Sequence, residues 1–170
     1  NVVDAALTVY GVFHLPFLFL FITLTRNLEG GIFFIWLIFI GAWVTDTFAY
    51  IFGNLFGKRK ITPVISPNKT LEGSVGGMLG CIGIMMLYGT FLIQGEHIDN
   101  ISVIHFAIIG LLCGLVSQIG DLSASAIKRY VQIKDYGKIM PGHGGVLDRF
   151  DSILFVAPVV YFYLSFIIFN

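Results

Sequence analysis

Four aspartates lie inside long apolar stretches of the sequence, where an ionised side chain is costly. They are Asp46, Asp121, Asp148 and Asp151. A charge at the centre of a membrane-spanning helix costs about 2.5–3.5 kcal/mol even on the most lenient scale. Carboxylates that meet in a small volume must take up protons or share a cation. Because Mg²⁺ favours one or two carboxylates together with substrate phosphates, we expect this group of acids to bind such an ion.

Two structural explanations for these acids stay open. Asp148 and Asp151 lie near an expected helix N-terminus, where the helix dipole stabilises a carboxylate by about 0.3–1 kcal/mol. Asp121 lies in the middle of its stretch, far from an N-terminus, but Lys128 or Arg149 could pair with it as a buried ion pair.

Polar residues recur at steps of three and four along three of the apolar stretches, so each set lies on one helix face. The sets are Gly114, Ser117, Asp121, Ser125 and Lys128; Asp148, Asp151 and Ser152; and Asp46, Tyr50 and Gly53. If the three helices pack together, their carboxylates meet near one end of the bundle.

Two polar segments carry residues that suit phosphate oxygens. In the segment 66–73, Thr70 resembles a helix N-cap and Glu72 suits the first turn, and the neighbouring Ser, Asn and Lys side chains can donate to an anion. The segment 141–145 is rich in glycine, which lets backbone N–H groups converge on an anion. His143 either donates to a phosphate or only marks a turn. Lys128, Arg129, Lys134 and Lys138 are either phosphate donors or ordinary loop residues.

Five apolar stretches must position these residues, near 5–25, 31–56, 72–94, 101–129 and 145–169. Hydrophobic residues make up 56% of the 170 residues and charged residues 12%, half the usual ~25%, so an ordinary soluble domain is excluded. The net charge of zero gives no support to nucleic-acid binding. We predict an all-α, polytopic transmembrane helix bundle of about five spanning helices, forming a single domain over residues 1–170.

The basic residues set the orientation of this bundle. All lysines and arginines except Arg26 lie in or beside the second and fourth connections, which two crossings place on the same side. The positive-inside rule makes that side cytoplasmic. A stripe of glycines in the third stretch, from Gly73 to Gly83, predicts close helix packing. Cys81 and Cys113 lack the spacing of a metal site and are expected to be small buried residues.

The segment from Ser125 to Asp151 resembles the signature of the CDP-diacylglycerol synthase family, also called the phosphatidate cytidylyltransferase family. The similarity is continuous over 27 residues and includes Pro-Gly-His-Gly-Gly at 141–145 and Asp-Arg-Phe-Asp at 148–151. The segments 46–53, 66–73 and 120–122 resemble the same family. Members commonly carry further N-terminal spans, so this chain is expected to be the C-terminal catalytic part.

The resemblance implies a Mg²⁺-dependent, all-helical membrane enzyme that converts CTP and phosphatidic acid to CDP-diacylglycerol and pyrophosphate. It also implies K⁺ as a second cation and a homodimer. Separately from the resemblance, we expect a bacterial plasma membrane, rather than an organellar one, as the location. Asp121 and Asp148 would be the metal carboxylates, with Asp46 and Asp151 as further candidates. The expected catalytic residues are Asp121, Asp148, Lys128, Arg129 and His143. The expected phosphate-binding residues are Ser66, Asn68, Lys69, Thr70, Lys134, Gly144, Gly145 and Arg149.

Two other functions fit part of this pattern. A CTP-dependent lipid kinase, such as a polyprenol kinase, would use the same substrate groups but attack the γ-phosphorus. An ion-coupled transporter could use intramembrane aspartates as ion sites, but would favour broken helices and acids near the membrane midplane.

Overall fold

The computed structural model describes residues 1–98, 101–137 and 145–169, apart from the side chains at positions 3, 7, 10 and 14. Its long helices are α1 (Val2–Arg26), α2 (Gly31–Phe56), α3 (Leu71–Gln94), α4 (Val103–Tyr130) and α5 (Leu147–Tyr163), and a π-helical turn (Leu164–Ile168) extends α5. All five are long and apolar enough to cross a membrane. The five predicted spans are therefore confirmed, with boundaries that differ by three residues or fewer apart from the C-terminal end of α5.

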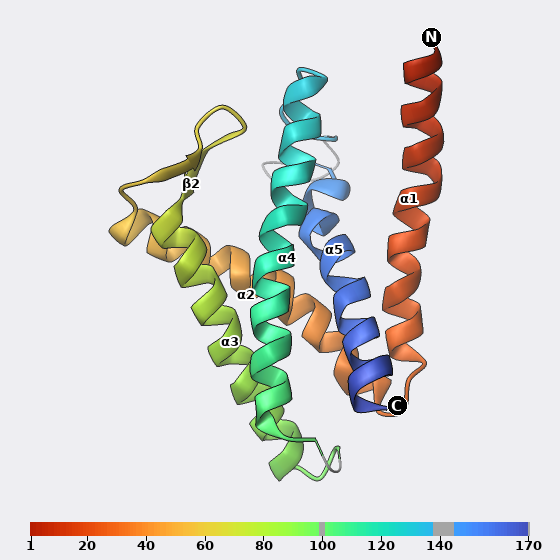
Figure 1. The fold of residues 1–170 in the computed structure, drawn as a ribbon, viewed down its shortest axis with the longest axis vertical. Helices are drawn as coiled ribbons and strands as arrows, with labels where there is room; N and C mark the ends of the chain where they lie inside the picture. Colours follow the sequence, from red (N-terminus) through yellow and green to blue (C-terminus); the bar gives the residue numbers. More distant parts are fainter. Residues whose placement is uncertain (99–100, 138–144, 170) are drawn as a thin grey trace.

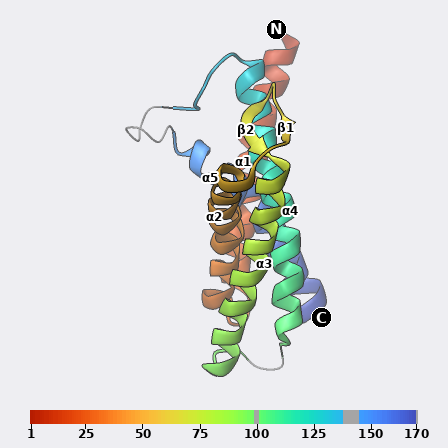
Figure 2. The same ribbon diagram turned by 90° about the vertical axis from the view of Figure 1, so that its left-hand side faces the viewer.

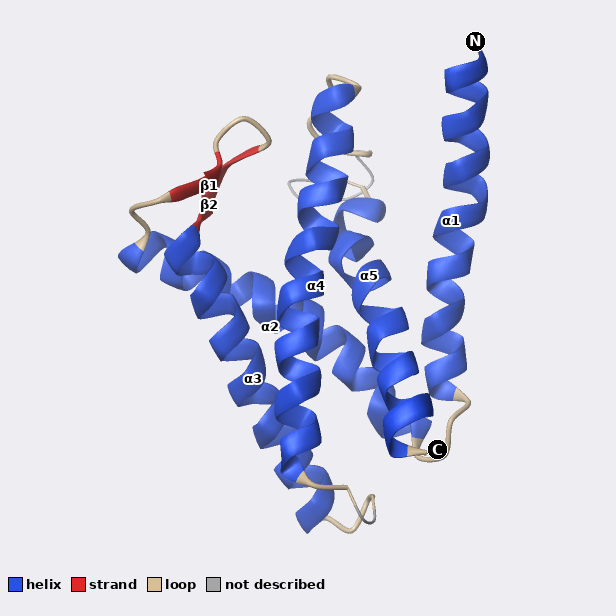
Figure 3. Cartoon of the chain, in the orientation of Figure 1, coloured by secondary structure: helices blue, strands red, loops and turns tan. Residues whose placement is uncertain are grey.

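The predicted helical bundle is confirmed, and a short two-stranded hairpin is added to it. Strands β1 (Lys60–Thr62) and β2 (Ser66–Thr70) pair antiparallel in the connection between α2 and α3 (Figure 3). The carboxylate of Glu72 accepts hydrogen bonds from the backbone N–H groups of Lys58 and Arg59, at 3.0 and 3.2 Å. The first turn of α3 thereby holds the start of the hairpin in place, a tertiary contact that the short polar strands do not reveal.

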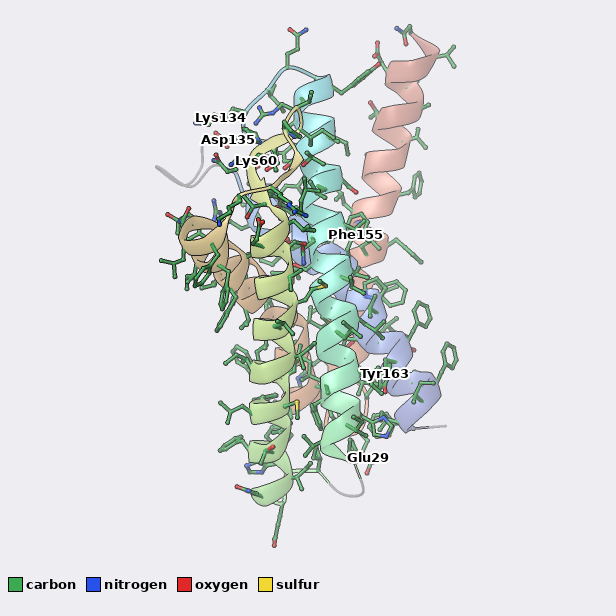
Figure 4. All side chains as sticks on the ribbon, turned by 60° about the vertical axis from the view of Figure 1, so that its left-hand side comes forward. Glu29, Lys60, Lys134, Asp135, Phe155 and Tyr163 are labelled. Atoms are coloured by element: carbon green, nitrogen blue, oxygen red, sulfur yellow. The ribbon has the colours of Figure 1, made fainter. Side chains whose placement is uncertain are left out.

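The polar connections lie at the ends that the charge pattern predicts. The hairpin, the end of α4 and the N-terminus lie at one end of the bundle, whereas the α3–α4 connection and the C-terminus lie at the other (Figures 1 and 2). The second and fourth connections thus share one end, as expected. Figure 4 shows Lys60 and Lys134 at this end and Glu29 at the opposite one.

The core is formed where α2, α4 and α5 meet. Leu37, Ile38, Cys113 and Val156 are completely buried there, and Gly41 of α2 faces Cys113 and Val156 closely. Cys81 and Cys113 are buried and free, as predicted. Large apolar side chains such as Leu79 and Leu87 remain exposed on the outside of the bundle, as suits a surface in contact with lipid.

The glycine stripe of α3 packs against α2. A Cβ atom at Gly77 would lie 2.8 Å from the carbonyl oxygen of Thr45 and 3.0 Å from Cβ of Ala49, and Gly73, Gly76 and Gly80 also face α2 closely. Gly83 has open space around it. The predicted packing face is therefore confirmed for the first four glycines and does not extend to the last. This contact brings the second and third helices together beneath the hairpin.

Replacing Gly77 by alanine tests this packing. Gly77→Ala should lower the free energy of unfolding by about 1–3 kcal/mol relative to Gly83→Ala, because its methyl group forces the two helices apart. Both variants gain the same helix propensity, about 1 kcal/mol, so their difference isolates the contact. Unfolding of the purified proteins in detergent measures it, and equal stability of the two variants would contradict the packing argument.

Candidate active site

A pocket of about 240 Å³ opens between the hairpin and the neighbouring ends of α2, α3 and α4. Its lining combines residues from all four elements: Asp46, Ala49, Tyr50, Ile61, Ser66, Asn68, Lys69, Thr70, Gly73, Ser74, Gln118 and Asp121. Six of these were candidate site residues, namely Asp46, Ser66, Asn68, Lys69, Thr70 and Asp121. The fold therefore brings the acids of two helices to the polar segment that precedes α3.

Thr70 caps the helix that borders this pocket. Its side-chain oxygen accepts a hydrogen bond from the backbone N–H of Gly73 at 3.1 Å, as the sequence predicts. An N-terminus capped in this way leaves a positive partial charge beside the pocket, which favours a bound anion.

Lys69 connects the hairpin to α4. Its Nζ lies 2.6 Å from Oδ2 of Asp121 and donates to the backbone carbonyl oxygen of Gln118 at 3.5 Å. Both charged side chains are about a quarter exposed, at 24% and 28%. The ion pair considered as an alternative for Asp121 named Lys128 or Arg149 as its partner, whereas the structure pairs Asp121 with Lys69 from a distant segment, and Lys128 binds another acid.

Carboxylates from three helices gather behind this ion pair. Asp46 of α2, Asp121 of α4 and Asp151 of α5 are close enough to interact electrostatically. Ser152 links two of them, because its hydroxyl donates to Oδ2 of Asp46 at 3.3 Å and its backbone N–H donates to Oδ1 of Asp151 at 2.8 Å. The predicted meeting of the three polar faces is confirmed.

The carboxylates supply hard oxygen ligands but no complete cage. Among the described residues, no group of three or more His, Cys, Asp or Glu side chains has the arrangement of a preformed metal site. Asp46 and Asp121 both line the pocket. Since Mg²⁺ commonly binds one or two carboxylates and completes its shell with substrate phosphates and water, this pair fits such an ion.

Asp148 has a different environment. It lies in the first turn of α5, as the capping explanation requires, and its side chain is 5% exposed. It accepts hydrogen bonds from Lys128 Nζ at 2.8 Å and from the backbone N–H groups of Tyr136 and Gly145 at 2.8 and 2.9 Å. This carboxylate therefore joins α4 to both described ends of the α4–α5 connection.

Tyr136 packs beside the same ion pair. Its hydroxyl donates to the carbonyl oxygen of Ala124 at 3.0 Å, and Lys128 Nζ lies 5.3 Å from the centre of its ring. Burial raises the pKa of Tyr136, and the carboxylates of Asp148 and Asp151 raise it further. The phenol therefore stays protonated at neutral pH and keeps its hydrogen bond.

The remaining predicted residues either do not line the pocket or lie outside the described residues. Arg129 Nε donates to the carbonyl oxygen of Ile65 at 3.3 Å and so ties α4 to the hairpin turn. Lys134 is exposed on the α4–α5 connection (Figure 4). Arg149 lies in the first turns of α5. His143 and Gly144 lie outside the described residues.

Ser74 and Gln118 line the pocket but were not predicted from the sequence. The helical stripe chosen on α4 contained Ser117, which is completely buried. Its neighbour Gln118 lies three residues before Asp121 and reaches the pocket instead. Two spacings in the sequence could have identified these residues. Gln118 lies at i, i+3 to Asp121, and Ser74 lies at i, i+4 to Thr70.

Comparison with known proteins agrees with the family resemblance of the sequence. The profile of the cytidylyltransferase family matches residues 1–167. A protein named phosphatidate cytidylyltransferase from Staphylococcus saprophyticus is 42% identical over 160 residues. Proteins of the same name from Staphylococcus haemolyticus and Staphylococcus aureus are 41% and 42% identical over 157 residues. Each alignment covers 92% of this chain and 58% of the relative, so the chain spans less than two thirds of these proteins.

The Lys128–Asp148 ion pair lies outside the pocket lining, and breaking it is expected to lower the stability of the protein. Lys128→Met should lower the free energy of unfolding by about 3–5 kcal/mol, because it leaves a nearly buried carboxylate without its cation. Adding Asp148→Asn should recover part of this loss, since the neutral amide keeps an oxygen for the backbone donors.

Lys134→Met, which removes an exposed lysine from the α4–α5 connection, serves as the control and should change the free energy of unfolding little. Unfolding in detergent measures the wild type, Lys128→Met, Asp148→Asn, the double variant and the Lys134→Met control. Additive effects of the two substitutions would show that the pair does not act as a unit.

Proposed function

Because this chain belongs to the cytidylyltransferase family, we propose that it carries the catalytic part of a phosphatidate cytidylyltransferase. In the proposed reaction, an oxygen of the phosphatidate headgroup attacks the α-phosphorus of CTP. The new P–O bond gives CDP-diacylglycerol as the bond to the β,γ-phosphates breaks, and pyrophosphate leaves. The names of the relatives support this substrate pair.

The observation that carries the proposal is that phosphate-binding donors and carboxylates line the same pocket. Lys69, Ser66 and the capped N-terminus of α3 offer donors to phosphate oxygens. Asp46 and Asp121 line the same pocket and offer oxygens to a cation. A nucleoside triphosphate with its divalent cation requires both kinds of group at once.

Asp46 and Asp121 would hold Mg²⁺ in this pocket, with Asp151 behind them. When bound, the ion supplies neutralisation of phosphate charge and stabilisation of the leaving group. The family resemblance assigns Asp148 to the metal as well, and that carboxylate could reach a cation only after Lys128 leaves it. K⁺ as a second cation rests on the resemblance alone.

The protein's main task in this mechanism is to position two polyanions. The attacking phosphate oxygen is ionised at neutral pH, so the reaction needs no strong general base. Lys69 would exchange its contact with Asp121 for a phosphate oxygen of CTP, which frees the carboxylate as the cation arrives. Ser66 and Thr70 add hydrogen-bonding groups at the same wall, and the fixed helix ends limit reorganisation during the transfer.

The position of the pocket suits a lipid substrate. It lies toward the basic end of five helices that could cross a membrane, and we expect lipid headgroups to lie at that end. We propose that this end faces the cytoplasm of a bacterial plasma membrane, as the positive-inside rule and the staphylococcal relatives support. A homodimer is proposed from the family resemblance.

Position-specific labelling of CTP distinguishes this function from its nearest alternative. Membranes that contain the protein should transfer radioactive phosphorus from the α-position of CTP to phosphatidate. Label at the γ-position should remain in water-soluble pyrophosphate. Transfer of the γ-label to lipid would instead identify a lipid kinase, and transfer of neither label would contradict the proposal.

The same assay tests the pocket. Asp121→Asn should lower α-label transfer by about 100-fold or more, because the substituted amide cannot compensate the cation. The control is Glu96→Gln, which removes a carboxylate in the α3–α4 connection at the opposite end of the bundle and should leave the rate unchanged. Near-normal transfer by folded Asp121→Asn protein would remove Asp121 from the mechanism.

A further inference from the structure

Gln118 has all the polar groups of its side chain engaged. Its Nε2 donates to the backbone carbonyl oxygens of Ser74 at 3.1 Å and Gly114 at 2.9 Å. Its Oε1 accepts a hydrogen bond from the hydroxyl of Ser74. The three bonds fix the orientation of the amide, because an exchange of its oxygen and nitrogen would place like groups against one another.

These bonds join two helices at the wall of the pocket. Ser74 lies in the first turns of α3, and Gln118 and Gly114 lie on α4. The backbone carbonyl oxygen of Gln118 also accepts from Lys69, whose other contact is Asp121, three residues further along α4. The separation of the α3 N-terminus from α4 therefore determines how Lys69 stands relative to Asp121.

We propose that Ser74 and Gln118 form a clamp that sets the spacing between the phosphate-binding wall of the pocket and Asp121, and so determines the affinity for the triphosphate of CTP. This inference rests on the proposed function and assigns two further residues to its site. Both are positioning residues, since the amide of Gln118 has no free group to offer a substrate.

Loss of the clamp should weaken binding of the nucleotide more than binding of the lipid. Lys69 and Thr70 directly precede α3, so any shift of the first turn of α3 away from α4 moves both of them. The carboxylate of Asp121 stays on α4. Loss of the clamp therefore separates the groups that bind phosphate from those that bind the cation, while the outer, lipid-exposed surface of the bundle keeps its form.

Kinetics of the membrane protein that carries this chain test the inference. Gln118→Met keeps the volume of the side chain and removes its hydrogen bonds, and should raise KM for CTP about tenfold with little change in KM for phosphatidate. Ser74→Ala is the milder variant, since it removes one bond, and should raise KM for CTP about threefold. The double variant should match Gln118→Met alone, because the two residues act as one unit.

Tyr88→Phe is the matched control. It removes another polar contact of α3 with a neighbouring helix, the hydrogen bond from the Tyr88 hydroxyl to the carbonyl oxygen of Phe33 at 3.0 Å, some four turns away from the clamp. A contact that only stabilises the bundle lowers the yield of folded protein without changing KM for CTP. Equal KM values for CTP in wild type, Gln118→Met and Ser74→Ala would therefore overturn the proposal.

A second measurement does not depend on activity. Lys69 is 24% exposed and paired, so a small amine-acylating reagent should modify it slowly in the wild-type protein. Gln118→Met should raise the rate at Lys69 several-fold, measured by mass spectrometry against the exposed Lys58 and Lys60, and Tyr88→Phe should not. An unchanged rate at Lys69 would contradict the clamp, whereas failure of wild-type protein to use CTP would contradict the proposed function.

Discussion

Carboxylates in an apolar helix bundle need compensation, and the way this chain provides it shapes the whole basic end of the molecule. Asp121 and Asp148 each have a lysine, whereas Asp46 and Asp151 share the neutral donors of Ser152. In the part of the chain that the structure describes, a lysine contacts Asp121 and Asp148 directly but not Asp46 or Asp151. Carboxylates of Asp46 and Asp121, lining one pocket with Lys69 and the capped end of α3, make that pocket suited to a cation and a polyanion together.

The large features of this arrangement follow from periodicity and from charge. Apolar stretches of more than 20 residues have few alternatives to membrane-spanning helices, so their number and order could be predicted. The steps of three and four between Asp121, Ser125 and Lys128 place them on one face, and Ser125 does donate to Asp121 at 3.4 Å. Thr70 was recognisable as an N-cap because capping depends on a few adjacent residues.

The partners of the charged groups could not be predicted, because they come from distant segments. Asp121 pairs with Lys69 across the hairpin, and Lys128 pairs with Asp148 on the next helix. Lys128 and Arg149 were the partners considered for Asp121, whereas the strand that precedes α3 brings Lys69 to it. The hairpin was missed for a similar reason, since Glu72 of α3 holds its first residues. Gln118 was overlooked because the polar face of the helix was assigned through its neighbour Ser117.

The most direct test of this account is an experimental structure of the protein with Mn²⁺ and a CTP analogue that cannot release pyrophosphate. The account predicts a Mn²⁺ peak at the carboxylates of Asp46 and Asp121, with the triphosphate against Lys69 and the Lys69–Asp121 contact broken. A bound nucleotide in another part of the molecule, with that ion pair intact and no metal at either carboxylate, would contradict it.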